Sequence, residues 1–200
     1  MKFRLIYFFL ICGVLACNAP LPIEKAPETG VIAQNGMVVT AHPLATKIGL
    51  EVLKNGGNAF EAAVAVQFAL AVVYPRAGNI GGGGLMVYRT AAGESGSLDF
   101  REKAPLLASR NMYLDEAGEP IKGASRNGGL AAGVPGSVDG MVKIYEKFGG
   151  KISFSDLVKP AVELAQKGFA LTQLEAEKLN AYQEEFKKAN GEGFVFLKEE

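Results

Sequence analysis

The sequence has little of the chemistry from which metal and redox sites are built. Its 200 residues include two cysteines, one histidine and no tryptophan. A structural zinc site takes four ligands, mostly Cys and His, and no acidic cluster stands near the single histidine, His42. His42 stands just before a predicted helix, so we expect it to be a packing residue or to cap that helix. The sequence therefore predicts no metal site and no cofactor.

An excess of charge of one sign is also lacking. Lys and Arg together number 21, as do Asp and Glu, so the formal net charge is zero. Nucleic-acid-binding domains usually carry a basic face or stripe, so we expect no nucleic-acid partner. Hydrophobic residues make up 48% of the chain, enough for a sizeable core. The length suits one compact domain or a fragment of a larger one.

No uninterrupted hydrophobic run is long enough to span a membrane, and the longest one stands at the N-terminus. After Lys2 and Arg4, the run Leu5 to Ala16 is about a dozen residues long, whereas a membrane-spanning helix needs roughly 20. The run ends in Val-Leu-Ala-Cys17, which resembles a bacterial lipobox, where the cysteine is lipidated. A plain secretory signal is the alternative.

These features predict three segments: a lipoprotein signal peptide at 1–17, a tether at 18–35 and a folded domain at 36–200. Cys12 would leave with the signal and Cys17 would carry lipid, so the mature chain is expected to hold no disulfide. We expect a lipoprotein of the bacterial periplasm or cell surface, held at the membrane by its lipid anchor only.

Hydrophobic periodicity and capping residues predict several helices within the domain. Asn58 and Glu61 have the spacing of a capping box, and the nearly all-apolar stretch that follows predicts a helix buried on all sides. Pro160 is expected to mark a kink or the true start of its helix. The expected elements are a strand at 37–41 and helices at 43–55, 59–73, about 138–148, 153–168 and 172–189.

A run of four glycines, Gly81 to Gly84, stands at the centre of the chain. Glycines allow another segment or a ligand to approach the backbone closely. A phosphate-binding loop is excluded, because the run lacks Gly-Lys-Ser/Thr and precedes a strand-like segment. Two short runs, 85–88 and 98–101, flank a glycine-containing turn and predict a β-hairpin.

Arg101 at the end of this hairpin is the strongest candidate site residue. Such an arginine is often solvated or ion-paired; Asp99 shares its face of the strand, whereas Glu102 does not. Alternatively, its guanidinium could clamp a carboxylate through two parallel hydrogen bonds. No serine or other hydroxyl has a recognisable nucleophile context, so the residues predict a binding arginine without a complete catalytic group.

Several stretches, in this order, are similar to the γ-glutamyltranspeptidase (glutathione hydrolase) family. The resemblance runs from about Gly36 to the C-terminus. The matching stretches are Ala-His-Pro-Leu-Ala at 41–45, Gly-Gly-Asn-Ala at 56–59, Gly-Asn-Ile-Gly-Gly-Gly-Gly at 78–84, Asp-Phe-Arg-Glu-Lys-Ala-Pro at 99–105 and Gly-Val-Pro-Gly at 133–136.

The resemblance implies an α/β (α+β) fold, the four-layer αββα sandwich of N-terminal-nucleophile hydrolases, incomplete in this chain. It implies a precursor that cleaves itself into two subunits and uses the new N-terminal threonine as nucleophile. That threonine is expected after Glu200, so no catalytic residue is expected in this chain and the fragment alone should be inactive. Arg101 would bind the α-carboxylate of γ-glutamyl substrates such as glutathione, and the small subunit of the same precursor would be its partner.

Other substrates on the same fold remain open at this stage. Poly-γ-glutamate and cephalosporin side chains are the alternatives for an enzyme, and a non-catalytic lipoprotein that binds γ-glutamyl peptides is the alternative of another class. Arg101 favours a substrate with an α-carboxylate but does not rank glutathione against a polymer.

Overall fold

The computed structural model describes residues 30–191, 193–194 and 197. The chain forms two units, Met1–Asn35 and Gly36–Glu200. The described residues of the first unit, 30–35, are exposed and belong to no helix or strand. The expected signal peptide, most of the tether and Cys17 lie outside the described residues. Across the part of the chain that the structure describes, no helix combines the length and apolarity needed to cross a bilayer.

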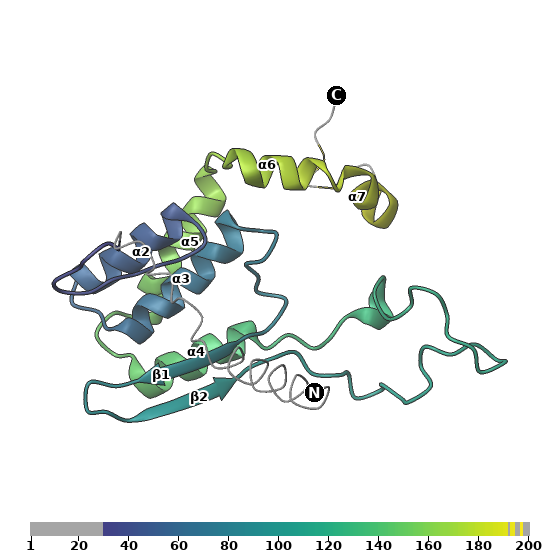
Figure 1. Ribbon diagram of the computed structural model, residues 1–200, viewed down its shortest axis with the longest axis horizontal. Helices are drawn as coiled ribbons and strands as arrows, with labels where there is room; N and C mark the ends of the chain where they lie inside the picture. The colour runs from purple at the N-terminus through teal and green to yellow at the C-terminus, as the bar shows by residue number, and fades with distance from the viewer. Residues whose placement is uncertain (1–29, 192, 195–196, 198–200) are drawn as a thin grey trace, which may run out of the picture. The chain divides into compact units, whose positions relative to one another are not determined.

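The second unit combines helices with one β-hairpin (Figure 1). The two strands pair with each other in an antiparallel register. The elements are α2 (Pro43–Lys54), α3 (Ala59–Val73), β1 (Leu85–Arg89), β2 (Ser95–Asp99), a 3₁₀ turn (Gly129–Ala131), α4 (Ser137–Phe148), α5 (Phe154–Lys167), α6 (Gln173–Asn180) and α7 (Gln183–Asn190).

Helix α3 lies at the centre of the helical layer, in contact with α2, α4 and α5. Its predicted capping box is confirmed: the Asn58 side chain accepts from the Phe60 and Glu61 amides, and the Glu61 carboxylate accepts from the Asn58 amide. Ala62, Val64 and other α3 residues are buried, although Ala59 and Ala63 remain exposed. The helix is therefore a core element, as expected, but it is not buried on all sides: six of its 15 residues are buried.

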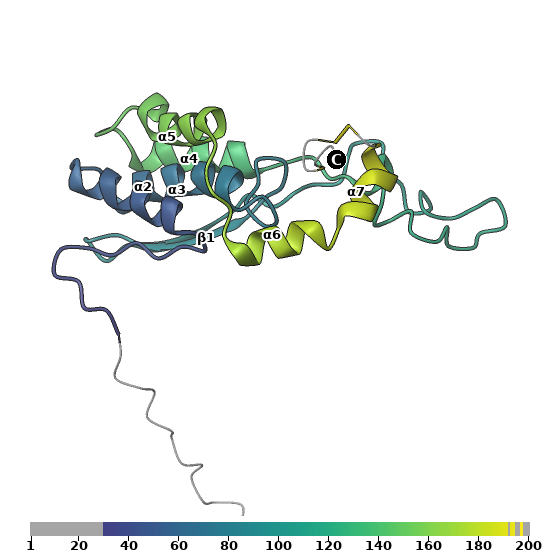
Figure 2. The ribbon, with the colours of Figure 1, turned by 90° about the horizontal axis from the view of Figure 1, so that it is seen from above.

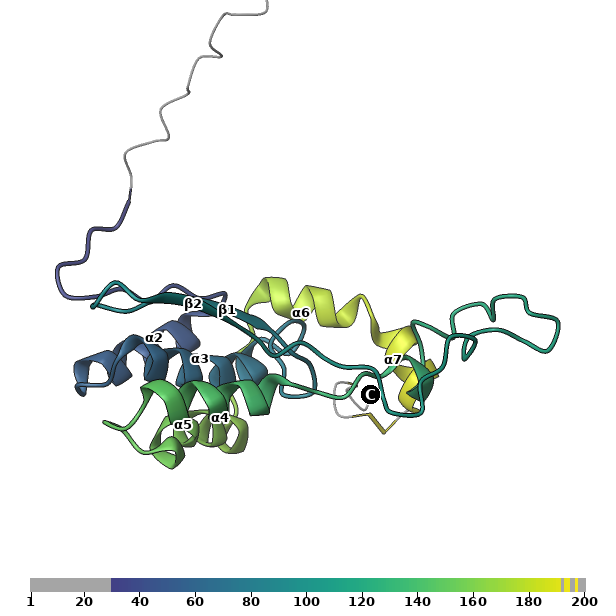
Figure 3. The ribbon, with the colours of Figure 1, turned by 90° about the horizontal axis from the view of Figure 1, so that it is seen from below.

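The predicted hairpin is confirmed, with strands 85–89 and 95–99. The second strand begins and ends earlier than the expected 98–101, because the turn already closes at 90–94, where the Thr90 amide donates to the Glu94 carbonyl oxygen at 2.8 Å. One face packs on the helices: Met86 and Leu98 face each other across the strands and join the core with Phe60 and Tyr145. Helices α2, α3 and α4 lie on this side of the hairpin (Figures 2 and 3). On the opposite face Val87 is 85% exposed. The described residues thus supply one helical layer and a two-stranded piece of sheet.

The expected strand at 37–41 is wrong. A strand needs a partner for its backbone groups, and within the described ranges β1 and β2 pair only with each other. Residues 37–41 instead run as irregular chain along α2, where Val38 packs against Gly49. The Thr40 hydroxyl bonds the His42 carbonyl oxygen at 2.8 Å.

Two helix predictions need correction. The helix expected at 172–189 is divided into α6 and α7, because at Tyr182 the backbone leaves helical geometry and its amide bonds Leu179, three residues back. Pro160 does not start its helix: α5 begins at Phe154, where the Ser153 side chain caps it, and contains Pro160 in its interior.

Candidate functional site

Arg101 is placed by the end of the hairpin. The ladder continues one pair beyond β2, because the Phe100 amide donates to Gly84 at 3.0 Å and the Gly84 amide donates back at 3.3 Å. Phe100 is 9% exposed and belongs to the core. A Cβ on Gly84 or Gly140 would meet its ring at 2.6 or 2.4 Å. This buried anchor fixes the backbone from which Arg101 projects.

Two glycines pack closely on the backbone of Phe100 and Arg101. A Cβ on Gly83 would lie 2.6 Å from the Phe100 carbonyl oxygen and 2.7 Å from Arg101 Cα. A Cβ on Gly136 would lie 2.1 Å from the same carbonyl oxygen and 3.0 Å from the Arg101 carbonyl oxygen. The glycine run therefore serves close backbone packing, as the sequence predicted, and a strand follows it where a phosphate loop would have a helix.

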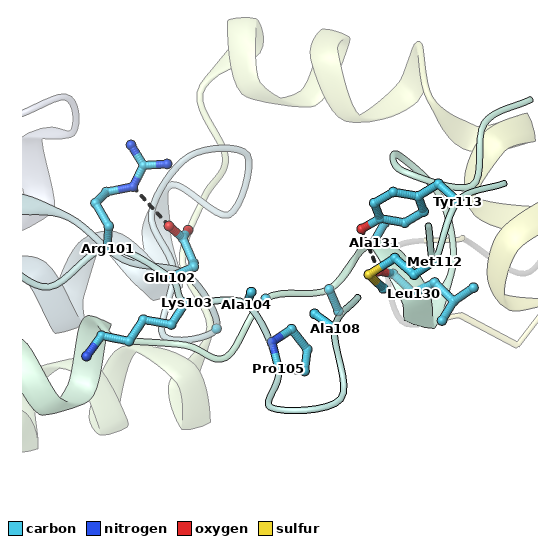
Figure 4. Close-up of a pocket in the computed structure, with 13 residues that line it drawn as sticks. Arg101, Glu102, Lys103, Ala104, Pro105, Ala108, Met112, Tyr113, Leu130 and Ala131 are labelled. Carbon is cyan, nitrogen blue, oxygen red and sulfur yellow. Dashed lines mark hydrogen bonds and ion pairs between the residues drawn. The ribbon is translucent and has the colours of Figure 1, made fainter. Parts of the chain in front are cut away.

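A cavity of about 440 Å³ lies next to this packed junction. Figure 4 shows Arg101 and Glu102 at one end and Met112, Tyr113 and Leu130 at the other. The Tyr113 hydroxyl donates to the Leu130 carbonyl oxygen at 3.0 Å and ties the two sides of the long loop together. The other lining residues are Gly81, Lys103, Ala104, Pro105, Ala108, Ala131, Ala132 and Gly133.

Glu102 is the ionic partner of Arg101. The Arg101 Nε atom lies 3.0 Å from Glu102 Oε2. Hydrogen bonding by its own backbone N–H, and then by Arg101, holds the pKa of the Glu102 carboxyl below its usual range. The Arg101 side chain is 64% exposed, and its two Nη atoms have no partner among the described residues. A carboxylate could therefore bind them without displacing Glu102.

Asp99 has a different role from the one its position on the strand suggests. Its Oδ1 accepts a hydrogen bond from the Arg101 backbone amide at 2.9 Å. The strand ends at Asp99, so the alternation of faces no longer applies to Arg101, and its guanidinium turns to Glu102 instead. Asp99 shapes the backbone, while Glu102 holds the side chain.

His42 caps α2, as expected. It is 5% exposed, and its Nδ1 accepts from the Leu44 amide at 3.2 Å. In the described part of the chain, no group of three or more His, Cys, Asp or Glu side chains is placed to hold a metal ion.

Sequence reasoning missed the loop side of the cavity. Tyr113, Met112 and Leu130 lie in a stretch without hydrophobic periodicity, whose regular structure is limited to turns, a 3₁₀ turn and isolated bridges. The sequence signal that was present, a dense set of turn-forming residues, predicts a loop but not the surface that it lines.

The fold and the sequence are similar to those of known proteins. The crystal structure of Helicobacter pylori γ-glutamyltranspeptidase matches with a TM-score of 0.79 and 46% identity, over 84% of this chain and 50% of that one. Glutathione hydrolase proenzyme of Pseudomonas sp. (strain A14) is 53% identical over 190 residues, 94% of this chain and 32% of the relative. Acylase ACY 1 proenzyme of Pseudomonas sp. (strain V22) is 39% identical over 169 residues, 78% of this chain and 30% of that relative.

These similarities show the class of protein: it is an α/β (α+β) protein with the N-terminal-nucleophile hydrolase fold. The aligned residues form part of that fold. Residues 45–200 match the family described as Gamma-glutamyltranspeptidase, and the chain belongs to that family. The chain spans about a third of the length of the curated relatives that it matches.

Proposed function

We propose that this chain is the large-subunit portion of a glutathione hydrolase/γ-glutamyltransferase. The proposed enzyme cleaves the γ-glutamyl amide of glutathione and its conjugates, with a threonine nucleophile that belongs to the small subunit of the same precursor. Membership of the family and 53% identity to a glutathione hydrolase proenzyme support this function. The acylase relative is more distant, at 39% identity.

The observation that carries the proposal is the state of Arg101. Its Nε is engaged by Glu102 at 3.0 Å, which leaves the outer edge of the guanidinium for a ligand beside the cavity. A guanidinium presents parallel N–H groups that match a carboxylate. Arg101 thus binds the α-carboxylate of the γ-glutamyl group and positions the scissile amide for attack.

A carboxylate clamp makes a specific kinetic prediction for the protein expressed from its complete gene. Arg101→Ala removes a charge-assisted pair worth about 2–5 kcal/mol when the partner charge stays buried. KM for γ-glutamyl-p-nitroanilide should rise by at least about thirtyfold, since 1.4 kcal/mol is tenfold. Self-cleavage should remain largely intact, visible as two subunits on a denaturing gel.

Two further variants sharpen this experiment. Arg101→Lys keeps the charge but loses the bidentate geometry, and we expect an intermediate KM. Arg89→Ala removes an exposed arginine from the turn end of the same hairpin and should leave KM unchanged. An unchanged KM in Arg101→Ala would contradict the assignment of Arg101 to the substrate carboxylate.

We further propose that the protein reaches the bacterial periplasm or cell surface and is tethered there by lipid on Cys17. The short apolar run and its lipobox-like end support this anchor. In this proposal residues 1–17 are the signal, 18–35 the tether and 36–200 the folded part.

A further inference from the structure

A hydrogen bond behind the glycine run joins two segments that lie 58 residues apart in the sequence. The Ser137 hydroxyl donates to Asn79 Oδ1 at 2.8 Å. Ser137 is 1% exposed and is the first residue of α4. Asn79 comes two residues before the glycine run, and its amide nitrogen donates to the Ala77 carbonyl oxygen at 3.3 Å. The bond therefore connects the start of the run to the start of a helix.

The backbone of the run is tied to the same helix. The Gly136 and Ser137 amides both donate to the Gly82 carbonyl oxygen, at 2.7 and 3.0 Å. The Asn79 side chain lies directly on Gly82, since a Cβ there would meet Asn79 Oδ1 at 2.4 Å. Asn79 thus holds the run in place both through Ser137 and by direct contact.

These two segments also pack on the Arg101 backbone. A Cβ on Gly83 would press on Arg101 Cα, and one on Gly136 would press on the Arg101 carbonyl oxygen. Glycines have more conformational freedom than other residues, so a four-glycine run needs outside contacts to keep one shape. The contacts around Gly82 come from the Asn79 side chain and the Gly136 and Ser137 amides, and neither the Asn79 nor the Ser137 side chain lines the cavity.

We propose that Asn79 and Ser137 are positioning residues for the Arg101 clamp: their hydrogen bond sets the glycine run and the start of α4 around the Arg101 backbone. The inference rests on the proposed function of Arg101. Loss of the bond lets the run relax and displaces the guanidinium, which weakens substrate binding without touching the reacting atoms.

The test compares kinetics of variants of the complete protein with γ-glutamyl-p-nitroanilide. Asn79→Ala and Ser137→Ala should each raise KM about tenfold with kcat within about twofold. The double variant should resemble the single ones, because both changes remove the same bond. Asn79→Asp keeps the acceptor oxygen for Ser137 but loses the donor to the Ala77 carbonyl oxygen, and its KM should lie between those of Asn79→Ala and the wild type.

Ser153→Ala is the matched control. It removes a hydroxyl that also ties the start of a helix, the exposed Ser153 cap of α5, and destabilises the fold away from Arg101. A protein that is merely less stable loses active molecules, which lowers the apparent kcat and leaves KM unchanged. Folded Asn79→Ala and Ser137→Ala proteins with a wild-type KM would overturn the inference.

Hydrogen exchange separates this inference from the proposed function. Amides in the peptide 98–103 should exchange faster in Asn79→Ala than in Ser153→Ala or the wild type, whatever the activity. If Arg101→Ala leaves KM unchanged while this exchange is faster, the proposed function fails and the positioning role stands. If exchange at 98–103 is unchanged, the positioning role fails. Should Asn79→Ala not accumulate, Ser137→Ala carries the same measurement.

Discussion

Glu61 should control the stability of the junction between α4 and α5. This side chain is fully buried. Its Oε1 accepts from the amides of Gly150, Lys151 and Ile152 at 3.1, 2.9 and 2.9 Å. Its Oε2 accepts from the Asn58 amide at 2.9 Å. One carboxylate therefore satisfies four backbone donors from two parts of the chain.

The expected cost of removing it follows from these contacts. A hydrogen bond to a charged group contributes about 1.5–3 kcal/mol. Gly150 and Lys151 are exposed, so in Glu61→Ala water can form hydrogen bonds with some of the backbone N–H groups that lose their partner. We expect the free energy of opening the turn at 150–152 to fall by about 3 kcal/mol. Its amide hydrogens should then exchange roughly a hundred times faster, since 1.36 kcal/mol corresponds to a tenfold change in the opening equilibrium.

Hydrogen exchange measured by mass spectrometry on peptides that cover 150–152 checks this in the complete protein. Glu51→Ala is the control: it removes an exposed carboxylate paired with Lys54 at 3.0 Å on α2 and should leave exchange at 150–152 unchanged. If exchange in Glu61→Ala stays within twofold of the wild type, the reasoning from the four hydrogen bonds is refuted.

The same turn should depend on pH. Burial raises the pKa of the Glu61 carboxyl, but hydrogen bonds from the amides of Ile152, Asn58, Lys151 and Gly150 lower it by more than burial raises it. The pKa therefore lies below its usual range. A lowered folded-state pKa gives stability that is fully present above the ordinary glutamate value of about 4.3 and is lost as pH falls through the lowered value. Exchange at 150–152, corrected for its intrinsic pH dependence, should accelerate only in that acidic window, and Glu61→Gln should abolish the acceleration.

Two further predictions concern the glycine run and the N-terminus. In denaturant titration, Gly83→Ala should destabilise the complete protein by about 1–3 kcal/mol, because its Cβ would press on backbone atoms of Phe100, Arg101 and Glu102. Gly129→Ala is the control, since the space around Gly129 is open, and it should leave stability unchanged. Equal unfolding midpoints for the two variants would contradict the packing argument. Cys17→Ser should stop incorporation of labelled fatty acid and release the protein from membranes; continued labelling would refute lipidation at Cys17.

Local sequence signals predicted the helices well because helix ends depend on neighbouring residues. Asn58 and Glu61 lie three residues apart, and their capping box could be recognised without any tertiary contact. The bonds from Glu61 to 150–152 span about 90 residues, and no local pattern encodes them. The wrong strand at 37–41 has the same cause, since β structure depends on a partner strand that the periodicity does not show.

The sequence predicted Arg101 as a candidate site residue, but it did not predict the contacts that surround this side chain. The hairpin and the family resemblance predicted where the arginine stands, and the glycine run predicted close packing. Arg101 pairs with Glu102 and not with Asp99, which shares its face in an extended strand. The strand ends at Asp99, so the alternation of faces does not continue to Arg101. The Asn79–Ser137 bond joins a loop to a helix start, and neither residue carries a signal of its own.

The arrangement explains why four glycines precede a strand in this chain. A side chain at Gly83 or Gly84 would push Phe100 and Arg101 out of place, and one at Gly82 would displace Asn79. Their absence lets three backbone segments approach one another closely enough to hold an arginine that is itself mostly exposed. Rigidity therefore comes from the backbone beneath Arg101 and from Glu102 beside it, while the outer guanidinium edge stays open. In the proposed role, a clamp built in this way would be preorganised without burying its charge, because the guanidinium would lose its water only when a substrate carboxylate arrives to pair with it.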